Sequence, residues 1–195
     1  MDIILASLSK RRSSILSSCG IRHKVIPSRV KETMKGRSPS RIAIINAEKK
    51  AKSVAGSRKS GYIIGADTVV LLNKKVVGKP KSASHAKSML RKMSGKAISV
   101  YTGLSVVDAR TQKRAIGYKK SIVRVRKINS REISRIFSLL GPYDKAGGFS
   151  IEGAGSFIFD NIKGSYFNVL GLPTALLRDL FSRLGFDLLR CVKKI

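Results

Sequence analysis

The sequence predicts an α/β fold, in which a mixed β-sheet is flanked by helices within a single domain, residues 1–195. Short apolar runs typical of strands alternate with amphipathic stretches along the whole chain. A chain of 195 residues of which 43% are hydrophobic is long enough to bury one substantial core. The sequence contains no internal repeat, low-complexity tract or obvious linker, so strands and helices are expected to share that core.

In the first half of the chain, hydrophobic periodicity and turn residues define the elements. Gly20 should end the first helix, and a polar, basic loop over residues 28–39 precedes the second, whose apolar side is Ile42, Ile45, Ala51 and Val54. Asp67 interrupts an Ile- and Val-rich strand, and the turn-like Asn73-Lys74 leads into a short return strand, as in a hairpin. The predicted strands are 3–6, 24–27, 62–72 and 76–77, and the predicted helices are 11–18, 40–55 and 84–93.

The second half begins with two long strands, 97–108 and 115–125, that read as another hairpin. A helix capped by Asn129 or Ser130 and stopped by Gly141 follows. Residues 143–171 are rich in glycine and turn residues, and a last helix starts with Pro173 in its first turn and ends before Gly185. The apolar stripes expected on these two helices are Ile133, Phe137 and Leu140, and Leu176, Leu177, Leu180, Phe181 and Leu184.

The charge of the chain is its most unusual property. It has 40 Lys and Arg residues against 11 Asp and Glu residues, a formal net charge of +29. Such a surface attracts polyanions in a salt-sensitive and sequence-independent way, which leaves non-specific binding of nucleic acid open. The basic residues are spread along the whole chain, and only 6% of residues are aromatic, few for stacking on bases. We therefore interpret most of this charge as solvated surface.

Several classes of protein are poorly supported. Cys19 and Cys191 lie at opposite ends, and His23 and His85 are also far apart, so neither a disulfide framework, a zinc site nor a Ser-His-Asp arrangement is indicated. No run of eighteen apolar residues exists, and the N-terminus lacks the features of a signal peptide. A cytoplasmic protein without a membrane segment is expected.

Carboxylates are scarce, so those in apolar surroundings are informative. Asp67 lies within Ile63-Ile64-Gly65-Ala66-Asp67-Thr68-Val69-Val70, where a desolvated acid needs a cation, a metal or backbone amides to compensate it. A functional role and a structural role are both consistent with that position. Glu32 in a polar loop, and Asp144 and Glu152 in the glycine-rich segment, could equally be ordinary loop residues.

The junction of the first strand and the first helix, Ala6-Ser7-Leu8-Ser9-Lys10-Arg11-Arg12, is a natural anion site. A helix N-terminus presents free backbone N–H groups, and the two arginines add bidentate donors for phosphate. The segment has no glycine-rich P-loop pattern. Among 40 basic residues, Lys50, Lys79 and Lys145 carry information only as a set.

Seven short motifs occur in one fixed order, and with them the chain resembles the Maf family over essentially its whole length. None is specific alone, but seven in register are strong support. They are Ala-Ser-x-Ser-x-Arg-Arg at 6–12, Ala-x-x-Lys-Ala at 47–51, Ala-Asp-Thr at 66–68, Gly-Lys-Pro at 78–80, Tyr-Thr-Gly at 101–103, Asp-Lys-Ala-Gly at 144–147 and Gly-Leu-Pro at 171–173.

The resemblance implies an inosine-triphosphatase-like fold with two lobes around a central groove, usually a homodimer, that splits nucleoside triphosphates into the monophosphate and pyrophosphate. It also implies a divalent cofactor, Mg²⁺ or Mn²⁺, held by Asp67 and Glu32, with Asp67 as the catalytic proton acceptor. The positions implied to bind substrate are Ser7, Arg11, Arg12, Lys50, Thr68, Lys79, Lys145 and Glu152.

The chain departs from the family pattern at two positions. Lys10 replaces a proline, which should loosen the entry to the helix. Arg11, Thr68 and Glu152 occupy positions where the branch resembling dTTP/UTP pyrophosphatases has arginine, threonine and glutamine, whereas the branch acting on 7-methyl-GTP has glutamate at the third position and glutamine in place of Thr68. The prediction is therefore dTTP and UTP, with 7-methyl-GTP or another modified nucleotide as the alternative. A basic nucleic-acid-binding protein and a phosphohydrolase releasing inorganic phosphate remain alternatives on the same fold.

Overall fold

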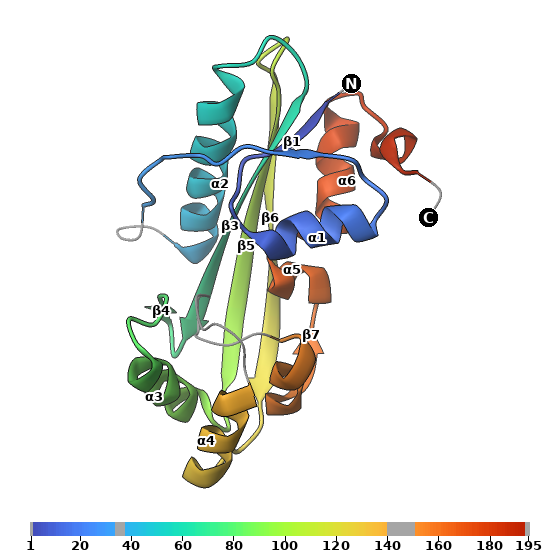
Figure 1. Cartoon of the computed structure of the whole chain (residues 1–195). Helices are drawn as coiled ribbons and strands as arrows, with labels where there is room; N and C mark the ends of the chain where they lie inside the picture. Colours follow the sequence, from blue (N-terminus) through green and yellow to red (C-terminus); the bar gives the residue numbers. More distant parts are fainter. Residues whose placement is uncertain (1, 34–37, 140–150, 194–195) are drawn as a thin grey trace.

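A computed structural model of the chain describes residues 2–33, 38–139 and 151–193 (Figure 1). Within these ranges, the centre of the molecule is one mixed seven-stranded sheet in the order β2-β1-β3-β5-β6-β7, with β4 paired to β3. β1 runs parallel to β2 and β3, and the other pairs are antiparallel. The strands are β1 (Ile3–Leu5), β2 (Lys24–Val25), β3 (Tyr62–Leu72), β4 (Lys75–Val77), β5 (Ala97–Asp108), β6 (Arg114–Val125) and β7 (Phe159–Lys163).

Helices cover both faces of this sheet, which confirms the predicted α/β class. Serine side chains at Ser9, Ser38 and Ser82 cap the first three helices by accepting from the backbone N–H three residues on. The helices are α1 (Lys10–Ser18), α2 (Pro39–Ala55), α3 (Ala83–Met93), α4 (Ser130–Leu139), α5 (Tyr166–Leu170) and α6 (Thr174–Arg183), with 3₁₀ turns η1 (Gly153–Ile158) and η2 (Leu188–Cys191).

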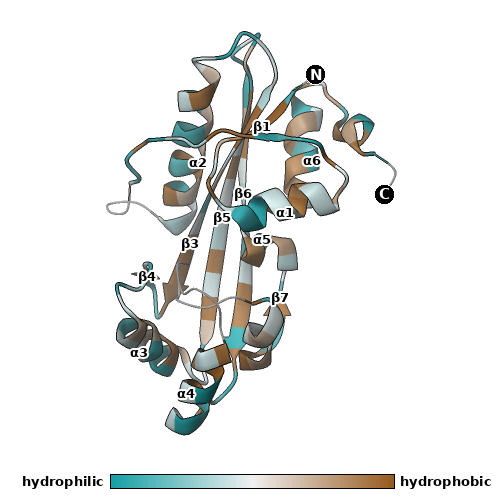
Figure 2. Cartoon of the chain, in the orientation of Figure 1, coloured by the Kyte–Doolittle hydropathy of each residue, from teal (hydrophilic) through white to brown (hydrophobic). Residues whose placement is uncertain are grey.

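The core follows the alternation of side chains along the strands. In β3, Ile64 and Ala66 belong to a large cluster with α1 and α6, whereas Ile63 packs with α2 residues such as Ala51 on the opposite face. Figure 2 shows hydrophobic residues concentrated along the central strands and on the helix faces that cover them.

The long strands β3, β5 and β6 run through the whole molecule and carry two groups of elements (Figure 1). The elements β1, β2, α1, α2 and α6 lie at one end, and β4, α3, α4 and β7 lie at the other. This arrangement agrees with the two lobes implied by the family resemblance. Among the described helices, none is both long and apolar enough to cross a membrane.

Most predicted boundaries agree with the structure to within one or two residues. The Asn73-Lys74 turn is confirmed, since both residues have positive φ, +48° and +63°, as a tight hairpin turn of the mirror-image type requires. The interruption expected at Asp67 is wrong, because β3 continues through it in register with Gly103 of β5. The segment 143–171, read as turns, contains η1, β7 and α5 in its described part.

Two predicted apolar stripes also need correction. Helix α4 buries Ile133 and Ile136, while Phe137 is only partly buried with Lys87 Nζ 5.4 Å from its ring centre, and Leu140 lies outside the described residues. On α2, Ile45 is only partly buried. The buried face of α2 includes two polar residues, Asn46 and Lys50, because both have partners beneath the helix.

Candidate active site

The candidate site lies at a gap along one edge of β3. This edge pairs with β1 over residues 62–64 and with β4 over residues 70–72, so among the described strands nothing pairs with residues 65–69 there. The N–H and C=O of one strand residue point to the same edge. Because Ile64 O accepts from Ala6 N at this edge, Ala66 and Thr68 also direct their backbone groups toward the gap. A ligand at the gap can reach side chains from both faces of the sheet.

Asp67 points to the face covered by α2 and is 7% exposed. Its Oδ1 lies 2.8 Å from Lys50 Nζ, and its Oδ2 accepts a hydrogen bond from Asn46 Nδ2 at 2.9 Å. Lys50 Nζ also lies 2.6 Å from Glu32 Oε1. The ammonium group therefore compensates the charge of both carboxylates, which explains why a buried carboxylate is tolerated in this apolar strand.

Two glycines allow α2 to lie close enough for these contacts. A Cβ at Gly65 would come within 2.1 Å of Ala47 O, and one at Gly103 within 2.4 Å of the Ala43 carbonyl group. Both distances are far below any real van der Waals contact, so only glycine permits this approach of helix and sheet. The close packing places Asn46 and Lys50, one helical turn apart, directly over Asp67.

Asn46 joins Asp67 to the loop that carries Glu32. Its Oδ1 accepts from Thr33 N at 2.8 Å, and its Nδ2 donates both to Thr33 O at 3.0 Å and to Asp67 Oδ2. Both N–H donors and one acceptor position of the amide are thus used by the described residues. The effect is to fix Glu32, the residue next to Thr33, beside Asp67 and Lys50.

On the opposite face, Arg12 connects α1 to β3 and to the loop before α6. Its Nε donates to Gly171 O at 2.8 Å, its Nη1 to Ser7 Oγ and Ala66 O at 3.1 Å each, and its Nη2 to Thr68 Oγ1 at 3.0 Å. Gly171 has a φ of +97°, and a Cβ there would lie 3.0 Å from Thr68 Oγ1, so the Gly-Leu-Pro motif needs its glycine.

Burial lowers the pKa of the Arg12 guanidinium, while the nearby charges of Asp67 and Glu32 oppose that shift. An arginine nevertheless remains protonated under all physiological conditions. Within the described residues, four of its five N–H groups donate to the protein. Arg12 therefore holds the surrounding segments together and leaves one N–H of Nη2 for a ligand.

Arg11 and Glu152 form a second connection across the site. Arg11 Nε lies 2.6 Å from Glu152 Oε2, and the carboxylate side chain is 45% exposed. The pair joins the start of α1 to the start of η1. The structure therefore brings together most of the predicted site residues, in two clusters on either side of the unpaired β3 edge: Asp67, Glu32 and Lys50 on one, and Ser7, Arg11, Arg12, Thr68 and Glu152 on the other.

Two predicted residues are not part of these clusters. Lys79 is exposed after β4 and makes no hydrogen bond or ion pair with the described residues. Lys145 lies outside the described residues. Both stay predictions.

The residues present fit a divalent cation such as Mg²⁺, which needs only a few protein ligands. No group of three or more His, Cys, Asp and Glu side chains converges within the described ranges, so a complete protein cage for a metal is absent there. Glu32 and Asp67 nevertheless converge on one cationic group, Lys50 Nζ. Two carboxylates, with water and substrate phosphates as the remaining ligands, are what Mg²⁺ commonly uses.

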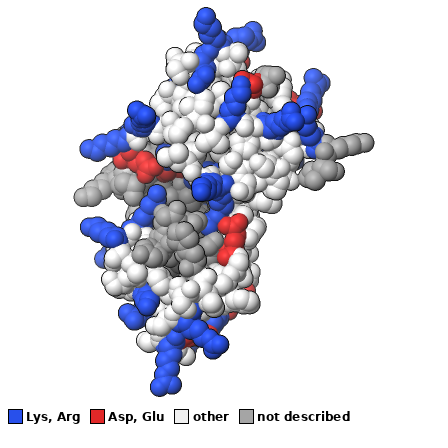
Figure 3. All heavy atoms as spheres, viewed as in Figure 1, with Lys and Arg blue, Asp and Glu red and all other residues white. Residues whose placement is uncertain are grey.

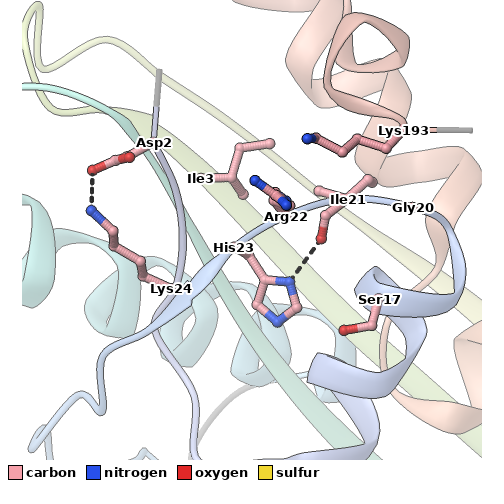
Figure 4. Close-up of a pocket in the computed structure, with 9 residues that line it drawn as sticks. All are labelled: Asp2, Ile3, Ser17, Gly20, Ile21, Arg22, His23, Lys24 and Lys193. Atoms are coloured by element: carbon pink, nitrogen blue, oxygen red, sulfur yellow. Dashed lines mark hydrogen bonds and ion pairs between the residues drawn. The ribbon is translucent and has the colours of Figure 1, made fainter.

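One cavity lies elsewhere, where α1 ends and β1 begins, with a volume of about 650 Å³ (Figure 4). Its lining side chains already have structural partners: Lys24 Nζ pairs with Asp2 Oδ2 at 2.7 Å, and His23 Nδ1 lies 2.9 Å from Ile21 O. None of the predicted site residues lines this cavity. A second, smaller one is lined by residues of the loop before α2 and of its C-terminal turn.

Sequence reasoning missed Asn46, Thr102 and Asn168. Asn46 precedes Lys50 by four residues, so a polar pair on an otherwise apolar helix face was the available signal. Thr102 and Asn168 are fully buried and bonded to each other, with Thr102 Oγ1 donating to Asn168 O at 2.8 Å. Thr102 belongs to the Tyr-Thr-Gly motif, although no role was assigned to it, and nothing local in the sequence distinguishes Asn168 from an ordinary turn residue.

Known proteins resemble this chain in sequence over nearly its whole length. A family model described as Maf-like protein matches residues 2–184. A dTTP/UTP pyrophosphatase of Dictyoglomus thermophilum is 37% identical over 190 residues, which cover 96% of this chain and 98% of that protein. Another from a Thermoanaerobacter species is 39% identical over 184 residues, covering 94% and 96%. A solved nucleoside-triphosphatase / dITP/XTP pyrophosphatase from Mycobacterium abscessus aligns with a TM-score of 0.44 at 12% identity, covering 95% of this chain and 97% of that one.

Proposed function

The chain belongs to the Maf-like family, and we propose that it is a pyrophosphatase that converts dTTP and UTP into the nucleoside monophosphate and pyrophosphate. The observation that carries this proposal is the meeting of a buried carboxylate, Asp67, with cationic and hydroxyl donors at the unpaired edge of β3. Relatives that are 35–39% identical over nearly the whole chain and bear the same activity in their names support it.

The groups around the junction of β1 and α1 suit a triphosphate. Ser7 Oγ accepts from Arg12 Nη1 at 3.1 Å and from Ser9 N at 3.2 Å, which uses both of its acceptor positions. Its hydroxyl proton is left to donate, and Ser7 is only 8% exposed. A phosphate oxygen, which only accepts, is the complementary ligand, and the first turn of α1 adds backbone N–H donors and a positive dipole end.

In the proposed reaction, Asp67 takes a proton from a water molecule as the water oxygen bonds to the α-phosphorus. The bond from that phosphorus to the oxygen bridging it to the β-phosphate breaks, and this oxygen leaves with pyrophosphate. Lys50, Arg11 and Arg12 offset the negative charge that develops on the leaving group. Asn46 holds the Asp67 carboxylate in one orientation throughout.

A Mg²⁺ or Mn²⁺ ion would be held by Asp67 and Glu32, and when bound it would withdraw charge from the phosphate oxygens. Lys50 Nζ now lies between these two carboxylates. We propose that this ammonium turns toward phosphate when the metal binds, which the long flexible lysine stem permits.

The test is pyrophosphate release from dTTP, UTP, CTP, 7-methyl-GTP, GTP and ATP with Mg²⁺ or Mn²⁺, beside an EDTA control and the Asp67→Asn variant. We expect metal-dependent release that is fastest with dTTP and UTP. Release of inorganic phosphate instead would indicate a different phosphohydrolase, and fastest turnover of 7-methyl-GTP would favour the alternative that Glu152 suggested. A homodimer and a cytoplasmic location stay predictions, which light scattering and cell fractionation would test.

A further inference from the structure

Thr102 and Thr68 form a hydrogen-bonded chain whose direction the structure determines. Thr102 Oγ1 lies 2.8 Å from the main-chain carbonyl oxygen of Asn168. A carbonyl oxygen can only accept, so Thr102 donates its single hydroxyl proton to it. Thr102 Oγ1 also lies 3.0 Å from Thr68 Oγ1, and in that second hydrogen bond Thr102 can therefore only accept.

It follows that Thr68 has no proton left for a ligand. Its hydroxyl donates to Thr102 and at the same time accepts from Arg12 Nη2 at 3.0 Å. A hydroxyl has one donor and two acceptor positions, so one acceptor position on Thr68 Oγ1 is left. Thr68 is partly exposed at the gap in the β3 edge, where that position can face a ligand.

Burial holds this chain of hydrogen-bonded hydroxyls in place. Thr102 and Asn168 are both 0% exposed, and Asn168 Nδ2 donates to Val100 O at 3.1 Å and to Ser121 Oγ at 2.9 Å. Ser121 in turn donates to Ser165 O at 3.0 Å, at the start of α5. The Asn168 side chain is thus fixed by contacts with β5 and β6, and reversal of this hydrogen-bonded chain would leave the buried Asn168 carbonyl only the Gly171 N–H, which it shares with Phe167 O.

We propose that Thr102 is a positioning residue for base selection. It accepts the hydrogen bond that the Thr68 hydroxyl donates, so Thr68 can act toward the base only as a hydrogen-bond acceptor. An acceptor favours a base with a ring N–H at the contacted position, as in the imide of uracil and thymine. Cytosine carries an acceptor nitrogen at the equivalent position, which would face Thr68 Oγ1 without a proton between them. The inference rests on the proposed nucleotide pyrophosphatase function.

Arg12 thus lies between two hydroxyls, one that can only donate a further hydrogen bond and one that can only accept one. Ser7, on its Nη1 side, has both acceptor positions used and can only donate, whereas Thr68, on its Nη2 side, can only accept. A nucleotide has the matching order, with acceptor oxygens on its phosphates and an N–H on its base. This complementarity supports the direction of binding in which the triphosphate lies toward Ser7 and the base lies toward Thr68.

The test is the ratio of kcat/KM for UTP to that for CTP in the wild type, Thr102→Val and Thr102→Ser, with pyrophosphate as the measured product. Valine has nearly the shape of threonine but cannot accept a hydrogen bond, so the Thr68 hydroxyl would be free to donate to cytosine. We expect the ratio to fall by about tenfold in Thr102→Val, chiefly through a lower KM for CTP, and to stay near the wild-type ratio in Thr102→Ser. An unchanged ratio in folded Thr102→Val would overturn the inference.

Thr68→Val provides a second variant at a partly exposed position, in case the buried change prevents folding. It removes the acceptor, so the UTP to CTP ratio should also fall by about tenfold, and adding Thr102→Val to it should change the ratio no further. A wild-type ratio in Thr68→Val would contradict the inference while the pyrophosphatase function stands. Absence of pyrophosphate release from any nucleotide by the wild type would overturn both.

Discussion

At the scale of single residues, the sharpest prediction concerns the substitution of Asp67. Its two oxygens face two donors, Asn46 Nδ2 and Lys50 Nζ. Asp67→Asn keeps the shape of the side chain but can neither take a proton nor hold a cation as strongly, so we expect kcat to fall by about 10²–10⁴-fold. Pyrophosphate release measures this, with circular dichroism as the check of folding. Asp160→Asn, an exposed acid on β7, is the matched control and should keep full activity.

Glu152 makes a prediction about base preference. Its carboxylate accepts from Arg11 Nε at 2.6 Å, and a glutamine would keep that acceptor while adding an N–H₂ donor. We expect Glu152→Gln to raise the preference for dTTP and UTP over 7-methyl-GTP by about tenfold, since one hydrogen bond to the base changes from acceptor to donor. Competition assays with paired substrates measure it. If the order of substrates stayed the same, Glu152 would serve only to hold Arg11.

At this scale the sequence predicted charged residues better than neutral ones. Asp67 stood out because a charge in an apolar context needs compensation, and the structure places it 2.8 Å from Lys50, which the sequence marked only as one of a set of lysines. No role was assigned to Asn46 or Thr102, because a buried amide or hydroxyl can be satisfied by any nearby backbone group, and the sequence does not show which group that is. Their roles depend on contacts between segments far apart in the chain.

The packing of α2 on β3 and β5 gives a prediction at the scale of elements. Gly65→Ala places a methyl group 2.1 Å from Ala47 O, so α2 must move away and carry Asn46 and Lys50 with it. We expect a loss of about 1–3 kcal/mol in the free energy of unfolding together with reduced kcat. Denaturant unfolding and pyrophosphate release measure the two effects.

Gly56→Ala is the matched control at the exposed end of the same helix. Gly56 has helical φ and ψ of −60° and −20°, and a Cβ there would meet nothing closer than Lys52 O at 3.6 Å. The change should therefore raise stability by about 0.4–1 kcal/mol and leave activity unchanged. Equal effects of the two substitutions would show that close helix packing does not position the site.

Periodicity predicted the long elements well because each strand or helix buries a regular face. It failed in the described part of the segment 143–171, where β7 pairs only with the C-terminal end of β6, residues 122–125, and α5 has five residues. Elements this short are held by tertiary contacts, such as the bonds of Asn168 to β5 and β6, and not by their own pattern. Gly171, whose positive φ ends α5, was the one local signal there.

For the whole molecule, the net charge of +29 predicts a second behaviour that is separate from catalysis. Figure 3 shows Lys and Arg side chains over both ends of the visible face rather than in one stripe. A charge distributed in this way should bind nucleic acid through phosphates alone. We expect duplexes of unrelated sequence to bind equally well, and their affinity to fall by about a hundredfold or more between about 50 and 200 mM salt.

Fluorescence anisotropy of two labelled duplexes, measured with wild type and Asp67→Asn at both salt concentrations, checks this prediction. Because the duplex would touch the dispersed basic surface and not the β3 edge, the variant should bind as the wild type does while losing pyrophosphate release. A preference for one sequence that survives high salt requires contacts to base edges. That result would mean that the basic surface was built for a nucleic-acid partner, and the binding function would then stand beside the enzymatic one.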